Sequence, residues 1–243
     1  MRKILALLLL APALSWASSA KVPLERAPID PHDKASLQRG AAIFVNHCLN
    51  CHSASAMRYS RLADLGLTEQ QIKENLVFTG EKVGEAMVAA NDPAVSKAAF
   101  GVVPPDLSLA ARSRGPDWLY TYLRSFYRDP GSKTGWNNTV FPNVAMPHVL
   151  WEYQGRPVLN VTERMDERTG DTIQTRKLAL ERPGRLKPLE YDQYVGDLVN
   201  YLAYMGEPAQ ADRKQWGILV LFFLAGFFVL ALMLKTEYWK DVR

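Results

Sequence analysis

The chain has 243 residues, of which 48% are hydrophobic and 22% charged, with a formal net charge of +4. This length is sufficient for one or two domains with a hydrophobic core, and the composition is that of a globular protein with an added membrane segment. Arg2 and Lys3 supply half of the net charge, and no basic stripe of the kind that nucleic-acid-binding proteins carry is present, so we exclude that class.

The first twenty residues predict a secretory signal peptide. They combine a basic start, an apolar run from Ile4 to Leu10 and small residues around Ala17–Ala20. The apolar run is too short to span a bilayer, although an uncleaved anchor is the alternative. We therefore expect residues 1–20 to be removed, after Ala17 or Ala20, and residues 21–212 to form a domain outside the cytoplasm.

A proline-rich lead-in, residues 21–33, precedes the first predicted helix. Apolar residues recur at helical spacing through residues 34–48, and Asp33 or Ser36 is available as the N-terminal cap. This helix ends in the segment that contains both cysteines of the chain.

Two more helices are predicted in the middle of the chain. Thr68 and Gln71 have the spacing of a capping box, which indicates a helix over residues 67–78. A helix over residues 115–130 has a proline in its first turn, and we expect it to end at Pro130.

The segment 155–189 is charged and rich in β-forming residues, and it contains a turn sequence, so it predicts a β-hairpin excursion. The last soluble helix follows over residues 190–208, where apolar residues line one side. The predicted fold class is therefore mainly α, with long loops.

The segment Trp216–Leu234 contains no charge and matches the roughly 20 residues that cross the hydrocarbon core of a bilayer. A buried soluble helix is the alternative, but such helices seldom lack a polar face over this length. We take residues 213–235 as a transmembrane anchor. Residues 236–243 then form a cytoplasmic tail, because the charges beyond the span are weakly biased toward positive.

Both cysteines lie in one short motif, Cys48-Leu-Asn-Cys51-His52. Four interpretations compete: a redox dithiol, a structural disulfide, a zinc site and a covalent haem attachment. A redox dithiol belongs at the start of a helix in a βαβ setting, whereas these cysteines follow a predicted helix. A disulfide here would close a loop of only two residues and would constrain the unfolded chain very little. A zinc site would need a second cluster of ligands, which the sequence lacks.

Covalent haem accounts for each part of the motif. Cys48 and Cys51 are spaced to form thioethers with the two vinyl groups of one porphyrin, and His52 would supply the proximal imidazole. The secretion signal agrees, because c-type haem is attached outside the cytoplasm in bacteria. The sequence therefore predicts one covalently attached haem c and its iron.

Met146 is the candidate for the second axial ligand. It lies in a loop between Pro142 and Pro147, where the backbone has little freedom to move a weak sulfur donor away from iron. An ordinary loop methionine is the alternative, since methionine is a common filler. His148 could be the ligand instead, but we expect it to be a solvent-facing neighbour. Ligation by histidine and methionine raises the reduction potential and leaves no open position for a substrate.

The haem propionates also need partners. Arg58, Arg112 and Arg114 are candidates, because a guanidinium group binds a carboxylate with two parallel hydrogen bonds. Pro105, beside Pro104, is a candidate for a rigid wall of the haem pocket.

The arrangement resembles the cytochrome c1 family, the haem subunits of the quinol–cytochrome c oxidoreductase (cytochrome bc1) complex. The matching segments include CLNCH, MRYSRL, TEQQIKENLVFTG, PPDLSLAARSRG, FPNVAMPHVLWEYQG and YVGDLVNYLAYMGEPAQADRK, which extend over nearly the whole chain after residue 33. By position, the resemblance implies Cys48 and Cys51 as thioether attachments, His52 and Met146 as axial ligands, and a propionate-binding segment that contains Arg112 and Arg114.

The resemblance implies a cytochrome c core with loop insertions, in which the first and last soluble helices cross at the haem edge. It also implies a subunit, not an enzyme on its own, that carries single electrons from a Rieske iron–sulfur protein to a cytochrome c. The further partners would be cytochrome b and membrane lipid, in a dimeric complex of the respiratory chain of a bacterial inner membrane, with the haem domain in the periplasm. No nucleic acid is expected as a partner.

Two other functions stay open at this point. A membrane-tethered cytochrome that serves a terminal oxidase would share His52, Met146 and the anchor. It would not need the stretch of about ninety-five residues that separates the haem motif from Met146. A haem enzyme or gas sensor would need an iron with an open position.

Overall fold

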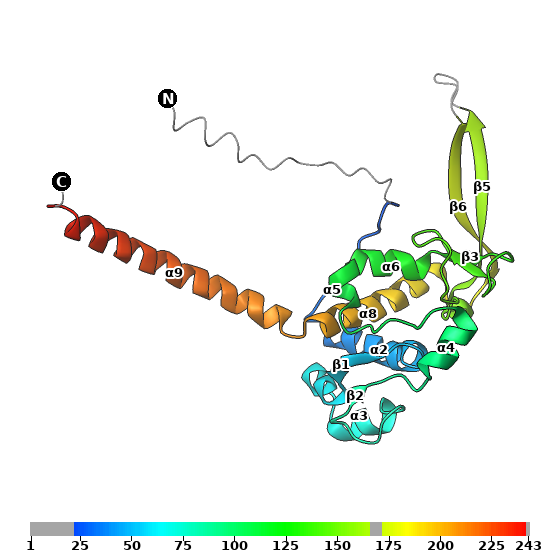
Figure 1. Cartoon of the computed structure of the whole chain (residues 1–243), viewed down its shortest axis with the longest axis horizontal. Helices are drawn as coiled ribbons and strands as arrows, with labels where there is room; N and C mark the ends of the chain where they lie inside the picture. Colours follow the sequence, from blue (N-terminus) through cyan, green and yellow to red (C-terminus); the bar gives the residue numbers. More distant parts are fainter. Residues whose placement is uncertain (1–21, 166–171, 242–243) are drawn as a thin grey trace.

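The computed structural model describes residues 22–165 and 172–241. The predicted signal peptide, residues 1–20, lies outside the described residues. The predicted mainly α fold class is confirmed: a helical body carries one long C-terminal helix and one long hairpin, which leave it in different directions (Figure 1).

The first helix, α2 (Lys34–Ile43), is capped as predicted, since the Asp33 carboxylate accepts a hydrogen bond from the Ser36 amide at 3.0 Å. The helix continues as a π-helical turn, Phe44–Cys48, in which the Leu49 amide donates to the Phe44 carbonyl. Such wide turns are frequently found at functional sites. This one sets the position of the first cysteine.

The last soluble helix, α8 (Pro188–Gly206), crosses α2 in the middle of the body (Figure 1). Gly40 makes this crossing close, because a Cβ atom there would collide with the Asp197 carbonyl oxygen. Phe44 packs against Tyr201 with ring centroids 5.7 Å apart, and both side chains are fully buried. The predicted crossing of the two helices is therefore confirmed.

The capping box is present at α3 (Glu69–Asn75), which ends three residues before the predicted boundary. The helix α6 (Pro116–Arg124) begins with its proline as predicted, but the expected end at Pro130 is wrong. The hydroxyl group of Ser125 binds the Thr121 carbonyl at 2.5 Å, and the chain then pairs as a strand.

Several short elements were not predicted, because each is stabilised by partners distant in the sequence. The three-residue strands β3 and β4 pair antiparallel, and β1 pairs with β2. The elements are β1 (Ala54–Arg58), the 3₁₀ segment Tyr59–Leu65, β2 (Ala86–Met87), α4 (Pro93–Phe100), α5 (Ala110–Arg114), β3 (Phe126–Arg128), β4 (Trp136–Asn138) and α7 (Trp151–Gln154).

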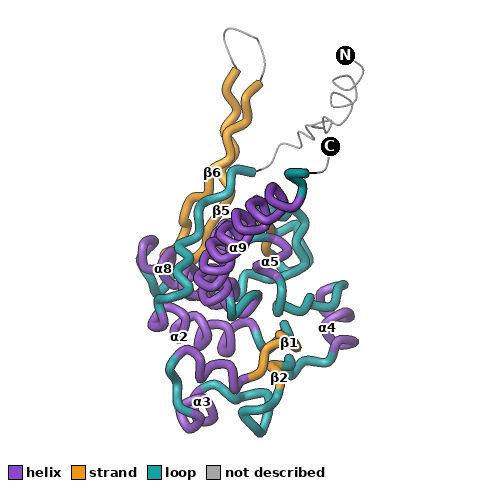
Figure 2. The backbone as a smooth tube through the Cα atoms, turned by 90° about the vertical axis from the view of Figure 1, so that its left-hand side faces the viewer, coloured by secondary structure: helices purple, strands orange, loops and turns teal. Residues whose placement is uncertain are grey.

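The predicted hairpin is confirmed as β5 (Gly155–Met165) and β6 (Thr172–Pro183), which pair antiparallel along their length. The two strands project from the body as a narrow arm (Figures 1 and 2). Its base is fixed at Gly155, where φ is +105° and a Cβ atom would collide with the Arg182 carbonyl. Most of the side chains beyond Pro157 are exposed.

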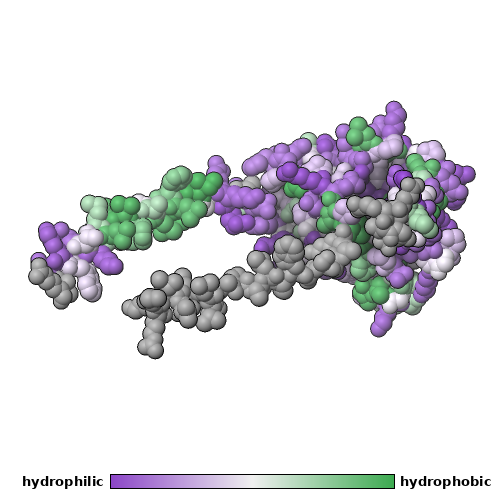
Figure 3. Space-filling model, turned by 90° about the horizontal axis from the view of Figure 1, so that it is seen from above, coloured by the Kyte–Doolittle hydropathy of each residue, from purple (hydrophilic) through white to green (hydrophobic). Residues whose placement is uncertain are grey.

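The C-terminal helix, α9 (Gln210–Tyr238), contains the predicted membrane segment. Its stretch Asp212–Tyr238 is long and apolar enough to cross a membrane, and the rest of the described chain covers none of its most apolar part. Figure 3 shows an apolar band along the helix with hydrophilic residues at both ends. Side chains of this kind are stable only in lipid or against a partner.

The close crossing at Gly40 predicts that Gly40→Ala lowers the free energy of unfolding by about 1–3 kcal/mol, because the added methyl group forces α2 and α8 apart. Denaturant unfolding of the full chain in detergent, followed by circular dichroism, measures this change. Gly84→Ala is the matched control, since a Cβ atom there has no neighbour within 4 Å. Equal stability of the two variants would contradict the prediction.

Candidate haem site

The two cysteines lie on one turn at the end of the helical segment. The Cys51 and His52 amides both donate to the Cys48 carbonyl, at 3.1 and 2.8 Å. Neither cysteine forms a disulfide; Cys48 is buried and Cys51 is partly exposed. The two cysteines are thus available on a single turn of chain that also carries His52.

The surroundings of Cys48 disfavour two of the competing interpretations. Burial raises the pKa of the Cys48 thiol to about 12, and a reactive dithiol needs a lowered pKa. No group of three or more histidine, cysteine, aspartate or glutamate side chains that could hold a metal ion occurs in residues 22–165 and 172–241. The buried position of Cys48 suits reaction with the apolar edge of a porphyrin better than it suits dithiol chemistry or zinc binding.

His52 is oriented by a backbone group. Its Nδ1 lies 2.7 Å from the Pro105 carbonyl oxygen. A carbonyl only accepts, so Nδ1 carries the proton and Nε2 is left as the nitrogen that can bind iron. Burial lowers the pKa of His52, which favours this neutral form. The sequence suggested Pro105 only as a rigid wall of the haem pocket. In the structure, its carbonyl oxygen orients the His52 ring.

The segment that carries Pro105 is itself clamped. Asp106 accepts hydrogen bonds from the amide and hydroxyl group of Ser55, at 2.8 and 2.7 Å, and from the Ser108 amide at 2.8 Å. Burial by itself raises the pKa of Asp106, but the hydrogen bonds from Ser108 and Ser55 outweigh it and hold the pKa below its usual value. The Leu107 amide also donates to the Ser53 carbonyl. The partner of His52 is therefore fixed to the strand that follows the motif.

Met146 is half-buried in its loop. Partial exposure is expected of a ligand whose sulfur atom has to reach a bound group. The Tyr122 hydroxyl group donates to its sulfur at 3.4 Å, and the Tyr122 ring stacks on Trp118 at 4.8 Å between centroids. Tyr122 is on α6, so this helix positions the sulfur atom. Among the described residues, the other methionines lack the combination of partial burial and a loop position: Met57, Met87 and Met205 are buried in the core, Met165 is exposed on the hairpin, and Met233 is exposed on α9.

Two asparagines hold the loop before Met146. The side-chain oxygen of Asn138 accepts from the amides of Val140 and Phe141, and that of Asn137 accepts from the Asn143 amide at 2.8 Å. These bonds satisfy backbone groups that would otherwise need water. Hydrogen bonds thus hold this loop. The sequence has no cysteine outside the motif, so a disulfide could not hold it.

The expectation that His148 faces solvent is wrong. Its side chain is only 2% exposed, and its ring stacks on Phe126 at 4.9 Å. Its Nε2 lies 2.6 Å from the side-chain oxygen of Gln154, and burial lowers its pKa to about 4. His148 is therefore a neutral packing residue that supports the end of the loop.

The three arginines have different surroundings. Arg114 lies over the Trp118 ring at 5.1 Å, in the cluster that contains Tyr122 and Met146. Arg112 packs against the end of α8 at Gly206, and Arg58 donates to the Gly84 carbonyl at 2.6 Å. The structure thus brings Arg114, and neither of the others, to the aromatic cluster beside the methionine.

A haem group fits the residues of this site. The segment that supplies the Pro105 carbonyl also exposes three apolar side chains, Val102, Val103 and Leu109, each about half accessible. Exposed apolar side chains on the segment that binds His52 would be removed from water by a porphyrin that covered them. This surplus of exposed apolar surface supports the haem interpretation independently of the motif.

Comparison with known proteins agrees with this geometry. The chain matches the family described as Cytochrome C1 over residues 25–158 and 187–242, so that most of the β5–β6 hairpin is outside the match. It is 50% identical over 247 residues to cytochrome c1 of Allochromatium vinosum, with 100% of both chains covered.

Two further relatives carry different names and differ in their sequence identity to this chain. The ammonia monooxygenase gamma subunit of Nitrosomonas europaea is 49% identical over 236 residues, which cover 97% of this chain and 96% of the relative. Cytochrome c1 of Rhodospirillum rubrum is 29% identical over 241 residues, covering 87% of this chain and 84% of the relative. The family match and the full-length identity together show that this chain belongs to the cytochrome c1 family.

Proposed function

We propose that this chain carries single electrons from a Rieske iron–sulfur protein to a cytochrome c. The observation that carries the proposal is the CLNCH motif, with His52 oriented by the Pro105 carbonyl, in a chain that is 50% identical to a cytochrome c1 over its full length. Membership of the family makes the chain a mono-haem c-type cytochrome with covalently bound haem c, and the haem subunit of the bc1 oxidoreductase complex with cytochrome b and the Rieske protein.

The proposed roles follow from the surroundings of each residue. Cys48 and Cys51 would attach the haem, and His52 and Met146 would bind its iron. When bound, the iron supplies a one-electron couple at a potential raised by the sulfur ligand. The Pro105 carbonyl fixes the tautomer of His52, and Tyr122 fixes the sulfur of Met146.

The propionate partners are a separate part of the proposal. Arg114 is the best supported, because its guanidinium group lies in the same cluster as Tyr122 and Met146. Arg58 and Arg112 remain candidates of lower rank, since their side chains contact Gly84 and Gly206 respectively. We propose no proton-transfer role for these arginines, and we expect that the chain does not catalyse quinol oxidation on its own.

The location follows from the two ends of the chain. The chain is anchored in the membrane by one C-terminal apolar helix. We propose that residues 1–20 direct export, that residues 21–212 lie in the periplasm, and that residues 213–235 cross the inner membrane of a bacterium. Residues 236–243 would then face the cytoplasm, and the complex would be dimeric and surrounded by lipid.

A second candidate function comes from the relative of Nitrosomonas europaea, whose name assigns it to an ammonia monooxygenase. A chain of that kind would deliver electrons to, or accept them from, an oxygenase. The same haem domain and anchor would serve both functions, so the partners decide between them.

Purification of the native assembly through a tag on this chain tests the proposal. We expect the reduced-minus-oxidised visible spectrum to contain bands of both c-type and b-type haem, and quinol to reduce the c-type haem. A c-type band alone, or one with oxidase haems, would point to a tethered carrier. Copurified monooxygenase subunits without cytochrome b would support the second candidate.

Replacement of the proposed sulfur ligand gives a second prediction. Met146→Leu should lower the reduction potential and allow carbon monoxide to bind reduced iron, because it removes the sixth ligand. Tyr122→Phe keeps the sulfur atom and removes one hydrogen bond, so iron should stay closed to carbon monoxide. Its potential should fall by no more than about 60 mV, which equals about 1.4 kcal/mol for one electron.

Redox titration and carbon monoxide difference spectra of the membrane-bound complex measure these effects. Met87→Leu is the matched control, because Met87 is fully buried in the core and accepts a hydrogen bond from Tyr201 in the same way. If Met87→Leu opened the iron and Met146→Leu did not, the ligand assignment would be wrong.

A further inference from the structure

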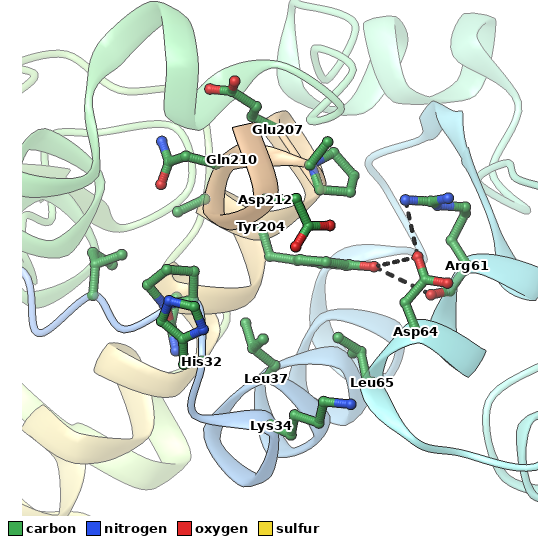
Figure 4. A pocket seen from close by; sticks show the side chains of 16 residues that line it. His32, Lys34, Leu37, Arg61, Asp64, Leu65, Tyr204, Glu207, Gln210 and Asp212 are labelled. Carbon is green, nitrogen blue, oxygen red and sulfur yellow. Dashed lines mark hydrogen bonds and ion pairs between the residues drawn. The ribbon is translucent and has the colours of Figure 1, made fainter. Parts of the chain in front are cut away.

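A pocket of about 600 Å³ lies at the junction between the haem domain and the membrane helix. Its walls come from the lead-in segment with His32, the start of α2, the 3₁₀ segment, the end of α8 and the first turns of α9 (Figure 4). The buried side chains of Leu37 and Leu65 lie along one side. Neither the haem ligands nor the hairpin contribute to it, so the pocket is separate from the electron-transfer site.

Most charges of the pocket wall are already paired. The Asp64 carboxylate binds Arg61 at 2.9 Å and accepts from the Tyr204 hydroxyl group at 3.1 Å (Figure 4). Glu207 pairs with Arg213. These interactions satisfy the groups that make them and leave little capacity for a ligand.

Two groups of opposite charge remain. Among residues 22–165 and 172–241, neither the Lys34 ammonium group nor the Asp212 carboxylate takes part in an ion pair or a side-chain hydrogen bond. Both line the pocket, and Figure 4 shows Asp212 near its middle and Lys34 at its edge. The pocket therefore offers one unpaired ammonium group and one unpaired carboxylate, and the His32 imidazole also lines its wall.

The height of the pocket relative to the membrane limits what can bind there. Asp212 precedes Trp216, the first residue of the uncharged span, by four residues, or about 6 Å of helix. The headgroup layer on each side of a bilayer is about 5–7 Å thick. Asp212 thus lies at the level of lipid headgroups when α9 spans the membrane.

We propose that this pocket binds the headgroup of a zwitterionic phospholipid with a primary ammonium group, as in phosphatidylethanolamine. Lys34 would bind the phosphate, and Asp212 would accept hydrogen bonds from the ammonium group. The inference does not depend on the haem ligands or on the redox partners. It requires only that α9 spans the membrane.

Other headgroups fit the two charges less well. A free phosphate or an anionic lipid satisfies Lys34 but places negative charge near Asp212, which is repulsive. A choline headgroup carries the right charge but has no N–H group to donate to the carboxylate. The combination of Lys34 and Asp212 therefore favours ethanolamine over these alternatives.

The assembly that contains the full chain, washed in detergent, is exposed to vesicles of equal parts phosphatidylethanolamine, phosphatidylglycerol and phosphatidylcholine. Lipid retained per chain after repurification is measured by mass spectrometry. We expect preferential retention of phosphatidylethanolamine, and retention at least about tenfold lower in Lys34→Gln and in Asp212→Asn, because each removes a charge-assisted hydrogen bond. Lys34→Arg should retain the lipid and shows that loss in Lys34→Gln is not a folding effect.

Lys214→Gln is the matched control, since Lys214 lies on the same helix at a similar height but does not line the pocket. It should leave retention unchanged. Equal retention in all variants would overturn the proposal, as would preference for phosphatidylglycerol or displacement of the lipid by inorganic phosphate. Loss of a protein subunit instead of lipid in Lys34→Gln and Asp212→Asn would show that a protein segment fills the pocket.

Discussion

The hydrogen bond between His52 and the Pro105 carbonyl links two segments that are more than fifty residues apart in the chain. Around it, the Asp106 carboxylate and the Ser53 carbonyl join the same two segments. The close crossing of α2 and α8 at Gly40 then places the end of the motif helix against the core. Orientation of the imidazole thus depends on a backbone acceptor that is itself held by neighbouring hydrogen bonds, so the site is preorganised by the fold.

Local signals in the sequence were sufficient for much of this architecture. The Asp33 cap, the capping box of Thr68 and Gln71, and the β-forming residues and turn of the hairpin are local signals that act over a few residues. These elements were therefore identified correctly. The end of α6 was misplaced because strand pairing, which is not local, overrides helix propensity there. The burial of His148 and the anchoring of its loop by Asn137 and Asn138 also depend on distant partners, which one sequence does not reveal.

The hairpin and the helical body contribute differently to the molecule. The family match stops at residue 158 and resumes at residue 187, so most of β5 and β6 lies outside the part that this chain shares with the family model. The full-length alignment with the relative of Allochromatium vinosum spans this region as well. A two-stranded hairpin is marginally stable alone. Its base at Gly155 and Pro157 is buried against the body, which explains how the arm can extend so far.

The chain has two cysteines, and both are in the haem motif. Any intramolecular disulfide must therefore form between Cys48 and Cys51, and it would consume the thiols that have to add to the porphyrin vinyl groups. If Cys48 and Cys51 attach the haem as proposed, an order of events during biogenesis follows: both thiols have to be kept reduced until attachment is complete. Once both sulfur atoms were bound to the haem, neither cysteine of this sequence would be open to thiol oxidants.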